Sequence, residues 1–340
     1  MASSLEAELR DLRNSHIFIT GGTGFFGIWL LESLLWANET RKLGLRVTVL
    51  SRSPEVFFQQ KAPHLKGRRD LNIIPGNLVS FRPPSEAATH IIHCATETNT
   101  EPASDWAQRH IDVSINGTRR LLAMAANHRP TAMLVTTSGA VYHAFDTMDG
   151  TRCVEGPSQL SDLTSERMVY SQSKRMIEVM TAVAADSIGF RALIARCFAF
   201  VGPYLPLNGN YAIGNFIRDA LTQRLIRVTG DGTPLRSYLY SADLVVWLLR
   251  ILIAGKSGVP YNVGGERCIS IGDLARLVAQ IEGNNTEVMI EGEADTVRPP
   301  SAYLPSLERT GTYLGLKESI QLEDAIRRTL NWYRPRLSLS

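Results

Sequence analysis

Short apolar runs that alternate with longer helical patterns limit most strongly how this chain can fold. Six runs rich in apolar and β-branched residues occur at 16–20, 46–50, 71–76, 90–95, 132–138 and 190–197. Helix-like segments such as 25–36 and 115–128 lie between them. Nearly continuously apolar strands, each followed by a helix, are typical of a parallel sheet covered on both faces. The sequence therefore predicts an α/β fold with a Rossmann-like, doubly wound parallel sheet.

The regular alternation of strand-like and helical patterns ends after about residue 198. Several prolines and glycines follow there, and the predicted elements then come in a different order. Helical patterns follow at 211–223, 270–281 and about 321–333, with strand-like runs at 260–265 and 286–291. We therefore expect a sheet domain and a smaller C-terminal substrate-binding lobe. The expected bounds are 1–197 plus about 239–265 for the first, and 198–238 plus 266–340 for the second.

The composition of the 340 residues narrows the class of protein. A hydrophobic content of 44% suffices for a large core, and a net charge of +3 gives no reason to expect a nucleic-acid partner. The N-terminus lacks the apolar segment of a signal peptide, and the most apolar helical pattern, 244–255, contains Arg250 and is too short to span a membrane. The four cysteines form no C-x-x-C pair. We expect a soluble, cytoplasmic protein with reduced thiols, no metal and no membrane partner.

A glycine-rich stretch, T-G-G-T-G-F-F-G at 20–27, joins the first apolar run to the first helical pattern. Gly21, Gly24 and Gly27 in this context permit a tight turn, a close approach of the backbone to a pyrophosphate, and close packing of helix on strand. The helix N-terminus would then meet the anion. The stretch predicts a dinucleotide site.

The end of the second strand bears on which dinucleotide binds. An acidic residue there would hold the ribose 2′-hydroxyl of NAD, but the chain has Ser51 and Arg52. Arg52 suits a 2′-phosphate, although it equally fits a solvated loop. The prediction is NAD or NADP, with NADP slightly favoured.

Three further residues carry acid–base chemistry. Tyr170 and Lys174 are spaced i, i+4, so they share one face if their segment is helical. An ammonium beside a phenol favours the phenolate and lowers the pKa of the phenol, which suits proton transfer. Ser138 ends a predicted parallel strand, where ligands of open α/β sheets bind, although it also fits a residue that merely ends the strand.

Together these segments resemble an extended short-chain dehydrogenase/reductase of the nucleotide-sugar epimerase and dehydratase kind. The resemblance spans nearly the whole chain and includes the segments 20–27, 136–142, 170–174, 195–204, 230–244 and 261–265. It implies a nucleotide-diphosphate sugar as substrate and Ser138, Tyr170 and Lys174 as the catalytic set. The implied cofactor contacts are Gly21, Thr23, Gly24, Phe25, Phe26, Gly27, Ser51, Arg52, Asn77, Leu78, Cys94, Ala95, Thr96, Tyr170 and Lys174. The implied substrate contacts are Thr96, Ser138, Gly139, Ala140, Tyr170, Arg236 and Arg298, the two arginines clamping the diphosphate.

The chain also departs from the family pattern. Ala199 replaces an asparagine that would contact substrate, and Asn77 replaces an aspartate near the adenine. Ser114 replaces the asparagine of N-V-x-G-T, and His143 replaces a glycine. None of these changes removes a member of the catalytic set.

The residues after Ser138 bear on the reaction that the resemblance implies. Dehydratase relatives carry Asp-Glu there, and decarboxylase relatives a Glu in the second position, whereas this chain has Gly139 and Ala140. Small residues leave room for a 4-keto sugar to turn, so the first interpretation is a nucleotide-sugar 4-epimerase. Three alternatives stay open: an NADPH-dependent 4-keto-6-deoxy sugar reductase, a dehydratase that uses residues such as Glu97 or His143, and a non-catalytic dinucleotide sensor.

Members of this family commonly pair through two helices of the larger lobe. The predicted helix 173–187 offers Met176, Ile177 and Met180 either for such a homodimer or for the chain's own core.

Overall fold

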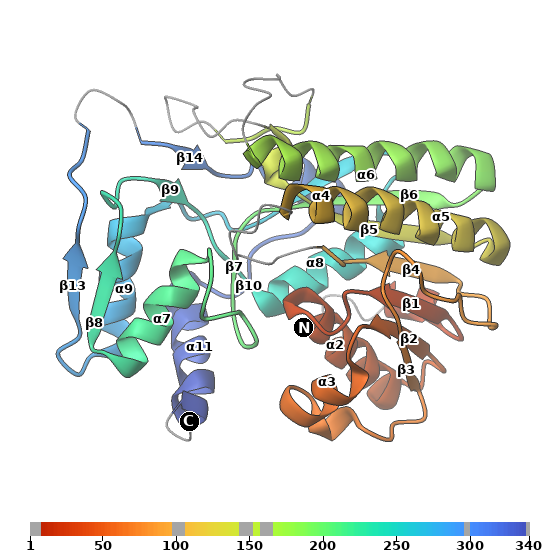
Figure 1. The fold of residues 1–340 in the computed structure, drawn as a ribbon, viewed down its shortest axis with the longest axis horizontal. Helices are drawn as coiled ribbons and strands as arrows, with labels where there is room; N and C mark the ends of the chain where they lie inside the picture. Colours follow the sequence, from red (N-terminus) through yellow and green to blue (C-terminus); the bar gives the residue numbers. More distant parts are fainter. Residues whose placement is uncertain (1–7, 97–105, 143–151, 157–165, 296–299, 338–340) are drawn as a thin grey trace. The chain divides into compact units, whose positions relative to one another are not determined.

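A seven-stranded sheet in the order β11-β6-β5-β4-β1-β2-β3 brings together strands from residues 16–263 (Figure 1). The computed structural model describes residues 8–96, 106–142, 152–156, 166–295 and 300–337. The strands are β1 (His16–Thr20), β2 (Arg46–Ser51), β3 (Leu71–Pro75), β4 (His90–His93), β5 (Ala132–Ser138), β6 (Arg191–Cys197) and β11 (Pro260–Val263). Strand β1 pairs in parallel with β2 and β4, β2 with β3, and β4 with β5. This is the Rossmann-like α/β fold that the sequence predicts.

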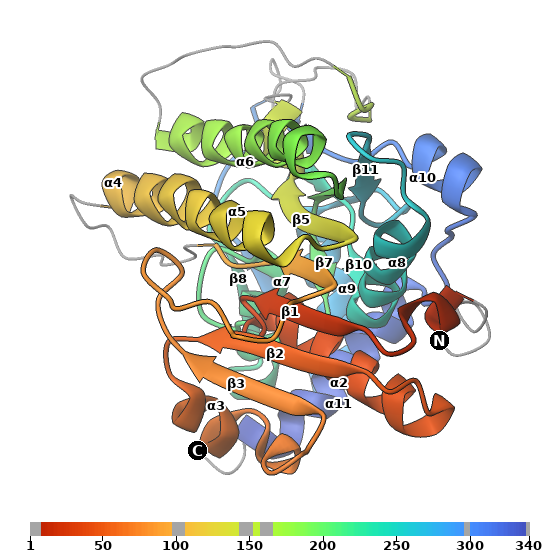
Figure 2. The same ribbon diagram turned by 90° about the vertical axis from the view of Figure 1, so that its right-hand side faces the viewer.

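Helices cover both faces of this sheet. They are α2 (Phe25–Arg41), α3 (Pro54–Gln60), α4 (Trp106–Ile111), α5 (Gly117–His128), α6 (Glu166–Ile188) and α8 (Ser241–Ala254), with short turns η1 (Glu8–Leu12), η2 (Pro63–Leu65), η3 (Asp112–Asn116) and η4 (Gly139–Tyr142). Helices α4, α5 and α6 lie on one face, and α2 and α8 on the other (Figure 2). Within the described residues, no helix has the length and apolar character needed to cross a membrane.

The core explains why the strands are almost wholly apolar. All five residues of β1 and all seven of β5 are buried. Phe18, Met133 and Val135 belong to one buried cluster with Leu121 of α5 and Ile177 of α6. Successive strand side chains point to opposite faces, so residues between them, such as Ile17 and Ile19, turn away from this cluster.

The predicted strands agree with the structure to within two residues at either end. The run 90–95 is shorter than expected, because β4 ends at His93 and the next two residues turn against Gly21. The helix expected at 115–128 is also different. It begins as a π-helical turn, η3, before α5 starts at Gly117.

The chain divides into two compact units. Unit 1 comprises 1–141, 160–196 and 245–261, and unit 2 comprises 142–159, 197–244 and 262–340. Residues 142–159, expected in the sheet domain, therefore group with the C-terminal part. The described portion shows why, since the Cys153 N–H donates to the Leu304 carbonyl and the Ser306 N–H donates to the Cys153 carbonyl.

Among the residues that the structure describes, unit 2 contains small sheets and four helices of its own. Its strands are β7 (Phe200–Val201), β8 (Leu225–Val228), β9 (Leu235–Arg236), β10 (Leu239–Tyr240), β12 (Ile269–Ser270), β13 (Glu287–Ile290) and β14 (Ala302–Tyr303). Its helices are α7 (Ala212–Thr222), α9 (Ile271–Glu282), α10 (Glu308–Leu314) and α11 (Leu322–Leu337). The strands pair as β10-β7, β12-β9-β14 and β13-β8.

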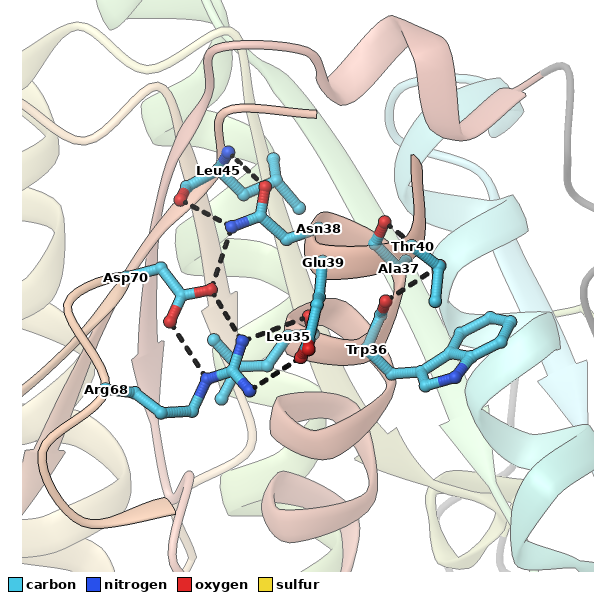
Figure 3. Close-up of polar contacts among 9 residues, drawn as sticks. All are labelled: Leu35, Trp36, Ala37, Asn38, Glu39, Thr40, Leu45, Arg68 and Asp70. Atoms are coloured by element: carbon cyan, nitrogen blue, oxygen red, sulfur yellow. Dashed lines mark hydrogen bonds and ion pairs between the residues drawn. The ribbon is translucent and has the colours of Figure 1, made fainter. Parts of the chain in front are cut away.

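A polar network ties the end of α2 to the strands that follow it (Figure 3). The Asn38 side chain accepts a hydrogen bond from the Leu45 N–H and donates to the Leu45 carbonyl and to Asp70. Arg68 donates two hydrogen bonds to Asp70 and one to Glu39. Burial alone would raise the pKa of Asp70, but the hydrogen bonds from Arg68 and Asn38 outweigh it and hold the pKa below its ordinary value.

Candidate active site

The predicted glycine turn lies directly between β1 and α2. Gly21 has a φ of +72°, and a Cβ there would lie 2.6 Å from the Ala95 nitrogen. At Gly27, a Cβ would lie 2.2 Å from the Gly21 carbonyl oxygen. The Gly24 N–H donates to that same carbonyl at 3.0 Å. Two of the glycines thus let β1, β4 and α2 meet at a distance that no side chain permits.

Gly24 has a different part in the turn. A Cβ on Gly24 would make only an ordinary contact, 3.4 Å from the Gly21 carbonyl oxygen, and Gly24 is the N-cap of α2 without a side-chain cap. The neighbours of Gly24 in the sequence are three expected cofactor contacts, Thr23, Phe25 and Phe26. The first N–H groups of this 17-residue helix have no side-chain cap, which is the arrangement that a pyrophosphate would need.

Lys61 is a residue near this turn that the sequence did not suggest. It follows α3, and its ammonium donates to the Thr23 carbonyl at 3.2 Å. It brings a positive charge to the loop in which a dinucleotide pyrophosphate would lie.

The remaining expected cofactor contacts follow the carboxyl ends of β2, β3 and β4. Ser51 is buried at the end of β2, and Arg52 after it is exposed. The Thr96 hydroxyl oxygen is buried, with no hydrogen-bond partner among the residues that the structure describes. A buried hydroxyl of this kind fits a site that a ligand completes.

Two others of these residues have structural partners. The Asn77 side-chain oxygen accepts from the Val79 N–H at 3.0 Å, and Leu78 is buried in the core cluster.

Burial raises the pKa of the Cys94 thiol to about 12, despite the hydrogen bond to Thr136 and the charge of Lys174. Cys94 is therefore a protonated wall of the site and not a nucleophile.

Helix α6 brings Tyr170 and Lys174 together as their spacing predicts. The Lys174 ammonium lies 5.8 Å from the centroid of the Tyr170 ring and donates to the Thr136 carbonyl of β5 at 3.4 Å. Lys174 is only 3% exposed, so its charge acts in a medium of low polarity. Ser138 ends β5, two residues after Thr136, and its hydroxyl oxygen accepts from the Ala140 N–H at 3.1 Å.

A neutral histidine lies beneath this pair. His93 of β4 is hydrogen-bonded through its two ring nitrogens to Thr20 and Thr118. Burial, reinforced by the charge of Lys174, lowers the pKa of His93 to about 3. His93 is therefore neutral at physiological pH and leaves Lys174 as the positive charge beside it.

An aromatic stack that the sequence analysis missed supports Tyr170. The His110 ring lies 5.3 Å from the Tyr170 ring and 5.1 Å from the Trp106 ring, centroid to centroid. His110 is fully buried, and its Nε2 is 3.3 Å from the Ser114 hydroxyl in the π-helical turn. The i, i+4 spacing of Trp106 and His110 is the one sequence signal that could have indicated this shared face.

Comparison with known proteins identifies the family. A model described as the NAD dependent epimerase/dehydratase family matches residues 17–264. The chain belongs to the NAD dependent epimerase/dehydratase family. It is thus an NAD-dependent enzyme of the short-chain dehydrogenase/reductase type. The glycine turn and the Tyr170–Lys174 pair both fall inside the matched residues.

Relatives with different names share this fold. UDP-glucuronic acid decarboxylase 1 from Xenopus tropicalis is 26% identical over 332 residues, covering 97% of this chain and 74% of that protein. The structure of UDP-glucose 4-epimerase from Thermotoga maritima, with UDP-glucose, has a TM-score of 0.77 at 19% identity, covering 95% of this chain and 99% of that one. That of dTDP-glucose 4,6-dehydratase from Bacillus anthracis, in complex with NAD, has a TM-score of 0.76 at 17% identity, covering 95% and 98%.

In unit 2 of this family member, Arg236 is held by an aromatic side chain. Its guanidinium carbon lies 5.9 Å from the Tyr303 ring centroid, and Nη1 donates to the Leu235 carbonyl at 2.8 Å. Tyr303 in turn packs on Phe198, with centroids 4.6 Å apart. Arg298, the second expected diphosphate contact, lies outside the described residues, as do Glu97 and His143.

Proposed function

We propose that this enzyme interconverts nucleotide-diphosphate sugars that differ in configuration at C4. The observation that carries the proposal is the buried Lys174 ammonium 5.8 Å from the Tyr170 ring, on a helix packed against the strand that ends at Ser138. This arrangement serves proton transfer to and from one sugar hydroxyl. The resemblance to nucleotide-sugar enzymes supports the substrate class.

The roles of the residues follow from their chemistry. Tyr170, as phenolate beside Lys174, removes the proton of the sugar 4-hydroxyl, and the Ser138 hydroxyl donates a hydrogen bond to the same oxygen. A nicotinamide dinucleotide held at the glycine turn would supply the hydride acceptor for C4 and, once reduced, the hydride donor for the other face of the transient 4-keto sugar. Tyr170 then gives the proton back, so that the sugar leaves with its C4 configuration inverted and its mass unchanged.

The turn after Ser138 favours epimerisation over elimination. Gly139, Ala140 and Val141 follow the serine in η4, and none can carry a proton. Tyr142, the next residue, donates its hydroxyl to the Asn262 side chain at 2.7 Å. A 4,6-dehydratase would need an acid and a base here, and a decarboxylase relative a glutamate, so the composition of η4 supports the epimerase.

For the substrate diphosphate, we propose Arg236 as a ligand. Its planar guanidinium can donate two parallel hydrogen bonds to phosphate oxygens. Packing on Tyr303 holds the plane and reduces the entropy lost on binding.

A second candidate is an NADPH-dependent reductase of a 4-keto-6-deoxy sugar. Arg52, exposed directly after β2 where NAD-specific enzymes carry an acid, supports it because a guanidinium can pair with a 2′-phosphate. This reductase would use the same Ser138, Tyr170 and Lys174, but NADPH would be consumed. We propose NADP specificity for this second candidate on the basis of Arg52, and a cytoplasmic location for either candidate.

We also propose a homodimer that buries the outer face of α6. Met176, Val179 and Val183 are 46%, 47% and 67% exposed on this helix. Spaced by three and four residues, they form one apolar stripe. Of the two roles that the sequence left open for Ile177, it takes the one in the chain's own core, because it is 1% exposed in the core cluster.

The experiment that tests the function is a substrate panel. The purified enzyme is incubated with NAD or NADP and with UDP- or dTDP-linked glucose, galactose, N-acetylglucosamine and glucuronic acid, and separately with NADPH and nucleotide-linked 4-keto-6-deoxy sugars. Products are followed by mass spectrometry and proton NMR. Conversion without a mass change supports the 4-epimerase. Loss of water indicates a dehydratase, loss of carbon dioxide a decarboxylase, and turnover only of 4-keto sugars with NADPH the reductase. Each of these three outcomes would contradict the epimerase proposal.

A further inference from the structure

A second charged group lies one helical turn beyond Lys174 and takes no part in the proposed chemistry. Glu178 of α6 is 4% exposed, and both of its carboxylate oxygens are hydrogen-bonded. Oε1 accepts from the Thr137 hydroxyl at 2.8 Å and from Arg196 Nε at 2.9 Å. Oε2 accepts from Arg196 Nη2 at 2.7 Å and from Arg175 Nη1 at 3.1 Å.

The three partners come from different parts of unit 1. Thr137 belongs to β5 and immediately precedes Ser138, while Arg196 belongs to β6 and is 2% exposed. Arg175 extends the network to η4, because its Nη2 donates to the Val141 carbonyl at 3.4 Å. One carboxylate therefore connects the helix of Tyr170 to the strand of Ser138 and to the turn that follows it.

Glu178 lies on the same helix as Tyr170 and Lys174, so its hydrogen bonds affect where those two side chains lie. Residues 170, 174 and 178 follow one another at intervals of four, so all three lie on the same face of the helix. The bidentate Arg196–Glu178 pair has a fixed planar geometry, which specifies both the rotation and the axial position of the helix on the sheet. Lys174 itself has a weaker anchor, the Thr136 carbonyl at 3.4 Å.

We propose that Glu178 is a positioning residue that holds the Lys174 ammonium beside Tyr170 and thereby sets the pH at which this phenol ionises. Glu178 acts through the helix and touches neither substrate nor cofactor. The proposal rests on the proposed function only for the use made of the phenolate. A carboxylate that merely stabilised the fold would leave the ionisation of Tyr170 unaffected.

The test is a double variant that removes the pair without leaving an unpaired buried charge. Glu178→Leu combined with Arg196→Met replaces both groups by apolar side chains of similar size, an exchange that buried ion pairs often tolerate. Thr137→Val removes only the link to β5 and keeps the shape of the side chain. Arg68→Met is the matched control, because it also takes a guanidinium from a carboxylate network of unit 1, the one in Figure 3.

Ionisation of Tyr170 is read from the ultraviolet absorbance of phenolate during a pH titration without substrate. Each protein is compared with its own Tyr170→Phe counterpart, and the difference isolates this one tyrosine. We expect the midpoint to rise by about one pH unit or more in the double variant and by less in Thr137→Val, since an opposite charge within contact distance shifts a phenol by about this much. Arg68→Met should leave the midpoint unchanged.

An unchanged midpoint in the folded double variant would overturn the proposal, as would an equal rise in Arg68→Met. If the double variant does not fold, Thr137→Val decides: a raised midpoint supports positioning, and an unchanged one overturns it. Because the titration needs no sugar, a negative substrate panel leaves this test intact. If the panel identifies a substrate, the double variant should also lose at least about tenfold in kcat with KM unchanged.

Discussion

Gly27 packs against Gly21 so closely that a Cβ on the first would lie 2.2 Å from the carbonyl oxygen of the second. Gly27→Ala must therefore move the backbone of the turn or of α2. We expect a loss of about 1–3 kcal/mol in the free energy of unfolding, together with loss of dinucleotide binding. Urea denaturation and calorimetric titration with NAD measure the two effects.

Gly24→Ala is the control for this variant, because its Cβ would be 3.4 Å from the nearest atom of the chain. It should keep nearly native stability and still weaken NAD binding, since the methyl group occupies space at the N-terminus of α2. Equal stability of the two variants would show that crowding at Gly27 is unimportant.

Replacing the phenol of Tyr170 tests its proton-transfer role. Tyr170→Phe keeps the ring that packs on His110 but removes the hydroxyl. We expect turnover to fall by about 10²–10⁴-fold, with the thermal midpoint and dinucleotide affinity nearly unchanged. Steady-state kinetics on the substrate found in the panel measure this, and wild-type turnover would exclude Tyr170 as the acid–base group.

The exposed guanidinium of Arg52 separates the two cofactors. Arg52→Ala should weaken NADPH binding by roughly three- to tenfold, because one solvent-accessible charge-assisted contact to the 2′-phosphate is lost. NADH binding should stay the same, as NADH has no such phosphate. Fluorescence titration of both reduced cofactors gives the ratio, and a parallel loss for both would place Arg52 away from the 2′ position.

Buried histidines should make unit 1 sensitive to acid. Burial, with the charge of Arg191, lowers the pKa of His90 from 6.5 to about 4, and that of His93 falls to about 3. As pH falls from about 6.5 to about 4, these histidines become protonated in the unfolded chain but stay neutral in the folded chain. The free energy of unfolding therefore decreases. Each histidine contributes on the order of 3 kcal/mol to this loss.

Urea denaturation between about pH 6.5 and pH 4 measures how steeply the free energy of unfolding changes with pH. His90→Gln removes one titrating group and should make the free energy of unfolding less dependent on pH. A slope that is the same in the variant would mean that His90 is protonated in the folded protein.

The apolar stripe on α6 predicts the effect of a surface charge. Val183 is 67% exposed, so Val183→Glu should fold normally but repel a second copy packed on this helix. Light scattering after gel filtration should show a monomer, with the parent protein a dimer. Tyr313→Glu, at a 74% exposed side chain of α10, is the matched control and should stay dimeric.

Local patterns were sufficient to predict the sheet and the glycine turn. β1 and β5 agree with their predicted bounds because every residue in them is buried and β-branched or apolar side chains dominate both. The i, i+4 pair of Tyr170 and Lys174 was also legible, since a helix fixes that relation by geometry alone.

Contacts between distant segments could not be predicted from such local patterns. Glu178 meets Thr137 across 41 residues, and no periodicity specifies which buried hydroxyl a carboxylate will find. His110 reaches Tyr170 only through the packing of α4 on α6. Cys153 groups with unit 2 for a similar reason, because its hydrogen bonds lead to Leu304 and Ser306, about 150 positions further along.

The π-helical turn from Asp112 to Asn116 has a consequence for how this enzyme can change during evolution. Such a turn contains about one residue more than an α-helix of the same rise, and each residue rotates a helix by about 100°. Deleting a single codon here would therefore swing Trp106 and His110 away from Tyr170 while α5 kept its place on the sheet. The packing that supports the Tyr170 ring is thus encoded partly in the length of the helix, where an insertion or deletion can alter it in one step.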